Sequence, residues 1–175
     1  MENDLPARKS PRLPGFDYGR YGAYFLTFCT HNKKNILSRV VVGEGSALPI
    51  SSFNATHKIE LLPCGKIADR WINKIPEKFP GTYVDCYVIM PNHIHLLLSI
   101  RNGAENGRET SSDTNTNSVL GWLKYNITKE INSTEKVFQR SYYDHVIRNR
   151  EDYNRIYKYI YENPMLWAAD VLFAE

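Results

Sequence analysis

Two histidines in one apolar run are the residues of this sequence best suited to chemistry. His93 and His95 lie two positions apart in the segment Met90 to Leu98, where isoleucine and leucine fill the places around them. In a strand, side chains at i and i+2 point to the same face, with Cα atoms roughly 6.6 Å apart. Two imidazoles so placed either form hydrogen bonds within the core or bind one metal ion together, and both interpretations stay open here.

A pair of strands must position these histidines. The β-prone run Tyr83 to Met90 predicts one strand, and Pro91-Asn92 predicts a turn, because proline presets φ and asparagine tolerates tight turns. The histidines then begin the return strand of a hairpin, with Ile94, Leu96 and Leu98 facing the core. Two histidines do not complete a metal's coordination shell, so a third ligand must come from another element.

The last predicted helix offers such a ligand. Asn149 is a suitable N-cap for a helix over residues 151 to 162, which we expect to stop at Asn163 because the residue before Pro164 is pushed out of the α region. The predicted packing stripe consists of Tyr153, Ile156, Tyr157, Ile160 and Tyr161. At about 100° per residue, Tyr159 lies about 120° from Tyr153 and on the same side as Asn163.

Two interpretations of Tyr159 compete. It is an ordinary surface tyrosine, or it is a nucleophilic phenol beside a metal-binding amide. In the second case the oxygen of Asn163 joins His93 and His95 in a mixed nitrogen and oxygen ligand set. That set suits a divalent metal, Mg²⁺ or Mn²⁺.

The remaining pattern predicts an α+β fold. The other predicted elements are a central strand over 23 to 30, a helix from Pro63 that Pro76 ends, a helix capped by Ser118, and an extended stretch from Phe138 that ends as a strand at Ile147. The order β, α, β-β, α, β, α fits a ferredoxin-like (split βαβ) antiparallel sheet with an extra C-terminal helix. Residues 40 to 58 contain the run Val40 to Val42, to which we assign no element.

Composition narrows the class of protein. The 175 residues are 42% hydrophobic with a net charge of +3, which predicts one mildly basic domain with a full core. No apolar run is long enough for a membrane span and no secretion signal is evident, so we expect a cytoplasmic protein. The sequence lacks Cys and His at zinc spacing, which disfavours a structural zinc site.

We divide the chain into three parts. Residues 1–21 form a basic N-terminal arm, residues 22–164 form the domain with a polar mobile loop at 101–117, and residues 165–175 form a C-terminal tail. Arg8, Lys9 and Arg12 give the arm its charge. Such an arm is either a disordered tail or a segment that contacts phosphates.

Taken in order, several motifs resemble one family. They are Arg8-Lys9-Ser10 through Leu13-Pro14-Gly15-Phe16-Asp17-Tyr18, Ala23-Tyr24-Phe25, Met90-Pro91-Asn92-His93-Ile94-His95, the run Gln139 to Asn149, and Tyr159-Ile160-Tyr161-Glu162-Asn163-Pro164. This ordered set resembles the REP-associated tyrosine transposases, in the single-tyrosine branch of the HUH nucleases. Phe138 departs from the pattern, since the family usually has tryptophan there.

The resemblance implies a metal-dependent endonuclease and strand transferase that cuts single-stranded DNA beside imperfect palindromes. Tyrosine attack on a phosphate then leaves a 5′-phosphotyrosine and a free 3′-OH. By position, Tyr159 is the nucleophile, while His93, His95 and Asn163 bind the divalent metal, Mg²⁺ or Mn²⁺. Lys124 matches a basic helix position of the family and joins the arm as a DNA-binding residue.

The same resemblance implies single-stranded or hairpin DNA as partner and association with the nucleoid when bound to DNA. We expect no membrane partner, and either a monomer or a homodimer. A second hypothesis is a non-catalytic nucleic-acid-binding module on the same fold. Such modules stack bases on exposed aromatic residues of the central strands. The strand after Pro91 offers histidine and leucine instead, which argues against this alternative.

Overall fold

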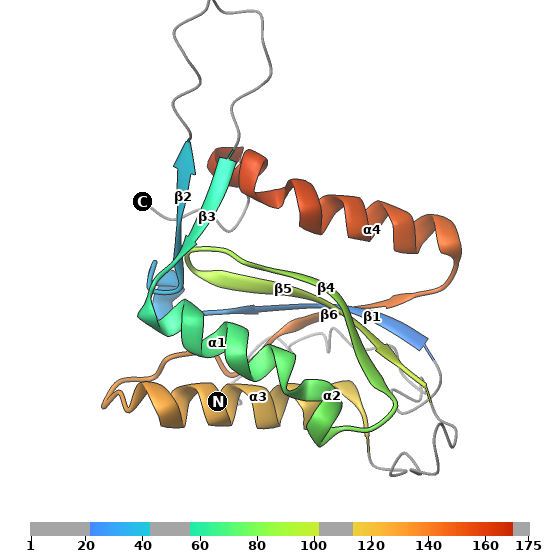
Figure 1. Cartoon of the computed structure of the whole chain (residues 1–175), viewed down its shortest axis with the longest axis horizontal. Helices are drawn as coiled ribbons and strands as arrows, with labels where there is room; N and C mark the ends of the chain where they lie inside the picture. Colours follow the sequence, from blue (N-terminus) through green and yellow to red (C-terminus); the bar gives the residue numbers. More distant parts are fainter. Residues whose placement is uncertain (1–21, 43–56, 102–113, 170–175) are drawn as a thin grey trace, which may run out of the picture.

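A computed structural model describes residues 22–42, 57–101 and 114–169 of the chain, and these form three layers (Figure 1). An antiparallel sheet lies in the middle, two long helices cover one face, and the helix α4 crosses the other. The arm residues Arg8, Lys9 and Arg12 and loop residues 102–113 lie outside the described ranges.

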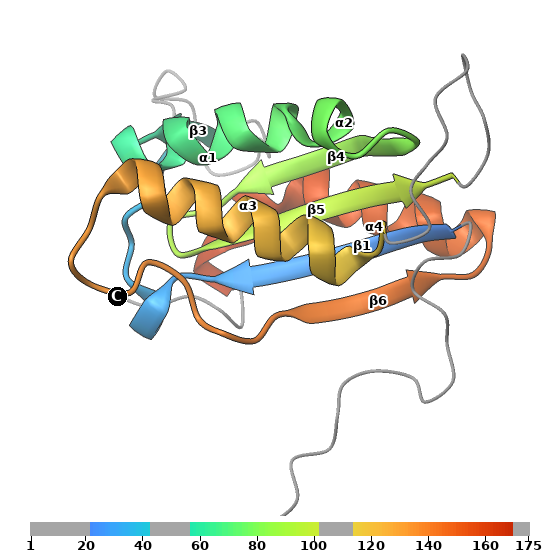
Figure 2. The ribbon, with the colours of Figure 1, turned by 90° about the horizontal axis from the view of Figure 1, so that it is seen from below.

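The main sheet has four strands: β1 (Gly22–Cys29), β4 (Thr82–Ile89), β5 (His93–Ile100) and β6 (Tyr143–Ile147). Their order is β4-β5-β1-β6, and each neighbouring pair is antiparallel. In Figure 2, β6 runs along one edge of this sheet. The order and directions are those of the ferredoxin-like fold, so the predicted fold class and the central position of β1 are confirmed.

A second, two-stranded sheet stands at one end of the molecule. It pairs β2 (Ser38–Val42) with β3 (His57–Leu61), in the region to which the sequence assigned no element. After β1, the 3₁₀ helix η1 (His31–Lys33) leads into this hairpin. At its base, the backbone nitrogen of Leu37 donates to the carbonyl of Pro91 (3.0 Å), and the carbonyl of Leu37 accepts from Leu62 (3.0 Å).

The base of the hairpin fits closely against the first turn of helix α1 (Pro63–Asn73). A Cβ built on Gly65 would lie 2.0 Å from the carbonyl oxygen of Leu37. Real side-chain atoms never approach an oxygen so closely, so this position requires glycine.

Helices α1, α2 (Ile75–Lys78) and α3 (Thr116–Ile131) lie along one face of the sheet. The first predicted helix is correct in place, but its end is wrong. It ends at Asn73, and Pro76 lies in the first turn of α2, where a missing N–H is tolerated.

The predicted start of the next helix also needs correction. Asn115 rather than Ser118 is the N-cap of α3, and the two residues form a capping box. The side-chain oxygen of Asn115 accepts from the backbone nitrogen of Ser118 (3.0 Å), and the hydroxyl of Ser118 accepts from the backbone nitrogen of Asn115. Thr116 and Asn117 therefore belong to the helix and not to the predicted loop.

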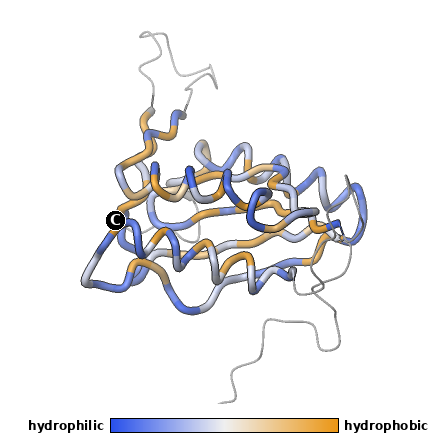
Figure 3. The backbone as a smooth tube through the Cα atoms, turned by 60° about the horizontal axis from the view of Figure 1, so that its bottom comes forward, coloured by the Kyte–Doolittle hydropathy of each residue, from blue (hydrophilic) through white to orange (hydrophobic). Residues whose placement is uncertain are grey.

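The larger hydrophobic core lies between the sheet and these helices. It contains Ile94, Leu96 and Leu98 of β5, which face this side as predicted, together with the stripe of α3 formed by Val119, Leu120, Leu123 and Ile127. Figure 3 shows the hydrophobic segments concentrated in the strands and on the inner sides of the helices.

The opposite face carries α4 (Arg150–Glu162) and the 3₁₀ helix η2 (Asn163–Ala169). Asn149 caps α4 as predicted, its side chain accepting from the Asp152 nitrogen (2.8 Å). The α-helix ends at Glu162 as predicted, with Asn163 as its C-cap, but the predicted reason is wrong. Asn163 keeps α-helical angles (φ −54°, ψ −40°), and the chain continues as a 3₁₀ helix past Pro164. A short 3₁₀ segment accommodates the proline in its first turn.

The packing stripe of α4 is narrower than predicted. Ile156 and Ile160 are buried against Phe25 and Leu97, with Tyr153 packed beside them. Tyr157 and Tyr161 are instead 45% and 78% exposed, so they do not belong to the stripe. No helix in the described ranges is both long and apolar enough to cross a membrane.

Candidate active site

The two histidines begin β5 and lie on the face that α4 covers. Both are buried, with 0% and 2% of their surface exposed for His93 and His95. Their rings meet at a centroid distance of 4.5 Å, and their Nε2 atoms face each other at 3.1 Å. Strand geometry therefore brings the two imidazoles together as the i, i+2 spacing predicts.

Each imidazole is oriented through its second nitrogen. Nδ1 of His93 lies 2.8 Å from the side-chain oxygen of Asn92, and Nδ1 of His95 lies 2.7 Å from the hydroxyl of Thr27. An amide oxygen only accepts, so Nδ1 of His93 carries the proton and its Nε2 presents a lone pair. A hydroxyl both donates and accepts, so Thr27 permits either tautomer of His95.

The electrostatic setting keeps His95 neutral. Burial, and then the neighbouring His93, hold the pKa of His95 well below its ordinary value. A neutral imidazole is the form that binds a metal ion. If Thr27 accepts from Nδ1 of His95, both Nε2 lone pairs point at one location, and a cation there would remove their mutual repulsion. If Thr27 donates to Nδ1, Nε2 of His95 carries the proton and donates to Nε2 of His93 at 3.1 Å.

Tyr159 contacts this pair from α4. Its hydroxyl lies 3.4 Å from Nε2 of His95, a long contact, and the two rings meet edge to face at 5.3 Å. The ring also packs edge to face on Phe25 at 6.0 Å. Tyr159 is 38% exposed as a whole residue, while its ring contacts those of His95 and Phe25.

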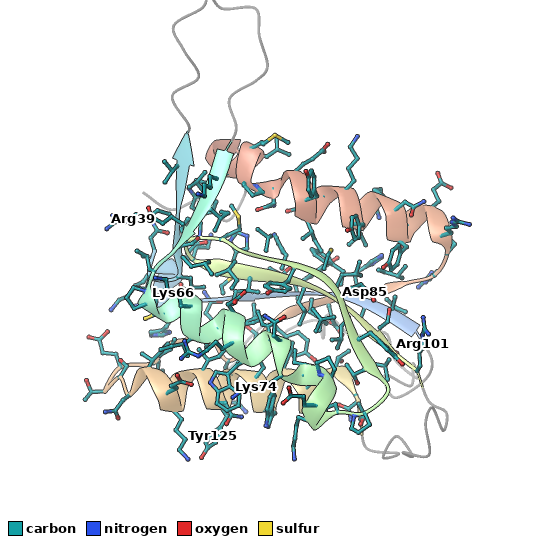
Figure 4. The ribbon with its side chains drawn as sticks, viewed as in Figure 1. Arg39, Lys66, Lys74, Asp85, Arg101 and Tyr125 are labelled. Carbon is teal, nitrogen blue, oxygen red and sulfur yellow. The ribbon has the colours of Figure 1, made fainter. Side chains whose placement is uncertain are left out.

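Tyr153 lies on the other flank of the same helix. Burial, followed by the nearby carboxylate of Asp85, raises the pKa of Tyr153 to about 12. Asp85 is the extra residue at a bulge in β4, and Figure 4 labels it on that strand. A phenol so disposed is harder to deprotonate than an ordinary tyrosine.

Asn163 follows Tyr159 by one helical turn and is 1% exposed. Four residues further on, the ring of Trp167 lies 5.8 Å from that of His93. Asn163 is thus flanked along the chain by residues that contact each histidine. Within the described ranges, no group of three or more His, Cys, Asp or Glu side chains is arranged to hold a metal ion.

The sequence did not identify several residues around the pair. They are Thr27 and Asn92, which orient the imidazoles, Phe25, which packs against both His95 and Tyr159, and Trp167. Asn92 is adjacent to His93 in the sequence and was assigned only to the turn. Thr27 is 68 positions from His95, and no spacing pattern connects the two.

Lys124 lies on the other side of the sheet, in α3. Its ammonium donates to the carbonyl of Gln139 (2.7 Å) and lies 3.3 to 3.4 Å from those of Ser141 and Arg140. Burial lowers the pKa of Lys124 to about 8. It lines a groove of about 400 Å³ that Lys129 and Lys136 also line. These hydrogen bonds hold residues 139–141, which precede β6, against α3.

Comparisons with known proteins support this architecture. A protein of Haemophilus influenzae with no described function is 27% identical over 183 residues, which cover 96% of this chain and 94% of that protein. The structure of a REP-associated tyrosine transposase bound to a REP hairpin is similar, with a TM-score of 0.55 and 20% identity over 90% of this chain and 73% of that one. No family model matches the sequence.

Proposed function

We propose that this protein is a metal-dependent endonuclease and strand transferase of the REP-associated tyrosine transposase kind. Its substrate is single-stranded DNA beside palindromic elements. The motifs of the sequence and the similarity to a transposase of that kind support the assignment. The observation that carries it is a partly exposed phenol beside two facing imidazoles: the Tyr159 hydroxyl lies 3.4 Å from Nε2 of His95, which lies 3.1 Å from Nε2 of His93.

In this proposal Tyr159 is the nucleophile. Its phenol gives up its proton and its oxygen attacks the phosphorus, while the bond from phosphorus to the 3′ oxygen breaks. The DNA on the 5′ side of the phosphate leaves with a 3′-OH, which takes up one proton, and the phosphate stays on the tyrosine as a 5′-phosphotyrosine. Phe25 and the wall of α4 hold the phenol in place for this attack.

His93, His95 and Asn163 would hold the divalent cation, Mg²⁺ or Mn²⁺. When bound, it would polarise the scissile phosphate. Asn92 and Thr27 orient the two imidazoles so that Nε2 of each faces the same point. Hydrogen bonds to the second nitrogen of a histidine ligand are the usual way in which proteins fix its direction.

Contacts to the remainder of the DNA belong to other parts of the chain. We assign phosphate contacts to Arg8, Lys9 and Arg12 of the arm and to the basic groove that Lys124 lines. The protein would act in the cytoplasm, at the nucleoid, as a monomer or homodimer. The domain would comprise residues 22–164, with the loop at 101–117 inside it, and residues 165–175 would form the tail.

The test is a denaturing gel of labelled single-stranded DNA that carries the palindromes flanking the gene of this protein. The native chain should give a slowly migrating covalent band in Mg²⁺ or Mn²⁺ and none in EDTA. Tyr159→Phe should bind the DNA and give no covalent band, because only the attacking oxygen is lost.

Tyr157→Phe and Tyr161→Phe are the matched controls, since they remove the same atom from the exposed side of α4. Both should keep the covalent band. Loss of the band in either control but not in Tyr159→Phe would reassign the nucleophile. DNA binding by the native chain without any metal-dependent cleavage would instead favour the non-catalytic nucleic-acid-binding module.

A further inference from the structure

Helix α4 covers only part of its face of the sheet. It packs against β4 and β5, and Tyr153 on one flank faces Asp85 of β4. Tyr159 lies on the opposite flank and contacts Phe25 of β1. The side of the helix that carries Tyr159 therefore faces the half of the sheet formed by β1 and the edge strand β6.

Tyr143 stands on this half of the sheet in the same row as the histidine pair. Thr27 of β1 is directly opposite His95 on one side and directly opposite Tyr143 on the other. Residues opposite each other in neighbouring strands project from the same face. His95, Thr27 and Tyr143 thus form one row, and Thr27 hydrogen-bonds His95 within it.

The ring of Tyr143 is exposed although its neighbours in the row are buried. Its exposed fraction is 53%, against 2% for His95 and 7% for Thr27. Its ring meets that of Phe25 edge to face at 6.3 Å. Phe25 also contacts the rings of His95 (5.2 Å) and Tyr159 (6.0 Å), so one buried phenylalanine supports both exposed phenols.

We propose that Tyr143 is a stacking platform for an unpaired base of the DNA strand whose phosphate lies at the histidine pair. The proposal rests on the function proposed above and names a base-binding contact within it. A strand that reaches Tyr159 from the β6 side passes over Tyr143. An exposed, supported aromatic ring binds any base through its π-face, which suits a protein that must hold DNA unpaired.

The position of Tyr143 also explains why an edge strand carries an exposed aromatic ring. Edge strands usually carry charged residues or proline that prevent association with other strands. Here Tyr143 is placed at the edge with its ring held by Phe25, so its face is available at little conformational cost.

The experiment measures binding in EDTA, where no metal-dependent cleavage occurs, so its result does not depend on the chemistry of Tyr159. Fluorescence anisotropy at fixed salt would compare two labelled 20-nucleotide probes: oligothymidylate, and an abasic strand of equal length and charge. Tyr143→Ala should bind oligothymidylate roughly 5- to 100-fold more weakly than the native chain. Both proteins should bind the abasic strand equally.

Two further variants complete the test. Tyr143→Phe keeps the ring and should bind oligothymidylate as the native chain does. Tyr161→Ala removes a more exposed tyrosine (78%) from the outer side of α4 and should also leave binding unchanged.

Three results would overturn the proposal: equal affinity of Tyr143→Ala and the native chain for oligothymidylate, an equal loss on both probes, or no preference of the native chain for bases. Failure of the proposed function appears differently, as a missing covalent band from a chain that binds DNA. If such a chain still binds bases through Tyr143, the stacking role of Tyr143 holds although the protein does not cut DNA.

Discussion

The two faces of the main sheet have different compositions. On the side of α1 and α3, β5 contributes Ile94, Leu96 and Leu98 to a large apolar core. On the side of α4, the same strand contributes His93 and His95. The buried apolar cluster there is much smaller and centres on Phe25 and Leu97 with two isoleucines of α4.

This difference separates stability from chemistry within single strands. Because side chains alternate along a strand, neighbours such as His95 and Leu96 belong to different faces. The larger core supplies most of the buried apolar area, and the smaller cluster fixes the helix that carries Tyr159. Substitutions on the side of α4 should therefore mainly lower activity, and substitutions on the side of α1 and α3 should mainly lower stability.

The largest expected effect is on activity. His95→Ala should reduce metal-dependent cleavage below detection, because one of two facing nitrogens is lost. Its free energy of unfolding should fall by about 1–3 kcal/mol, since the buried hydroxyl of Thr27 loses its partner. A covalent-band assay and urea denaturation measure the two quantities. Cleavage at the native rate would break the comparison.

The adjacent residue should show the reverse. Leu96→Ala leaves a cavity in the larger core and should cost about 2–5 kcal/mol. Cleavage per folded molecule at a low temperature should remain near the native value, because Leu96 faces away from the histidines. A loss of activity equal to that of His95→Ala would show that the two faces are not independent.

Thr27→Val would sharpen the comparison by removing one oxygen at nearly constant shape. The metal concentration needed for half-maximal cleavage should rise roughly 10- to 100-fold, as for other partners of metal-bound histidines. Thr27→Ser keeps the hydroxyl on Nδ1 of His95 and should restore most of this loss. Equal behaviour of the two variants would assign the role of Thr27 to packing.

The smallest expected effect comes from Lys124, on the side of the sheet that α3 covers, and is a dependence of the free energy of unfolding on pH. Because the pKa of Lys124 is lowered to about 8 in the folded protein and is near 10.4 unfolded, the unfolded chain binds more protons between these values. The contribution of Lys124 to stability should therefore rise with pH from about 8 to 10.4. Lys124→Met should lack this rise when unfolding is followed by circular dichroism across that range. If the stability of the variant and of the native chain changes with pH in parallel, Lys124 is not the cause.

Local patterns predicted much of this structure. The alternation of side chains along β5 correctly predicted that Ile94 and His95 point to opposite faces of the sheet. Asn149, followed by acidic residues in the first turn of the helix, was correctly predicted as the N-cap. Both depend on residues only a few positions apart. The wrong cap at Ser118 has the same origin, because Asn115 and Ser118 are both good capping residues and form reciprocal bonds.

Other features depend on contacts that no local pattern contains. Helical periodicity gave the angle between Tyr153 and Tyr159, but not which sector of α4 faces the sheet, so Tyr157 and Tyr161 were wrongly assigned to the packing stripe. The partnership of Thr27 with His95 follows from the register of β1 against β5. That register is set by the packing of the whole sheet.

The glycine at the base of the small hairpin has a genetic consequence. Gly65 allows α1 to approach Leu37, whose backbone binds Pro91 at the turn that begins β5. Asn92 of that turn orients His93. A screen for inactive alleles should therefore recover substitutions at Gly65, a residue with no reactive group, alongside those at the histidines and Tyr159.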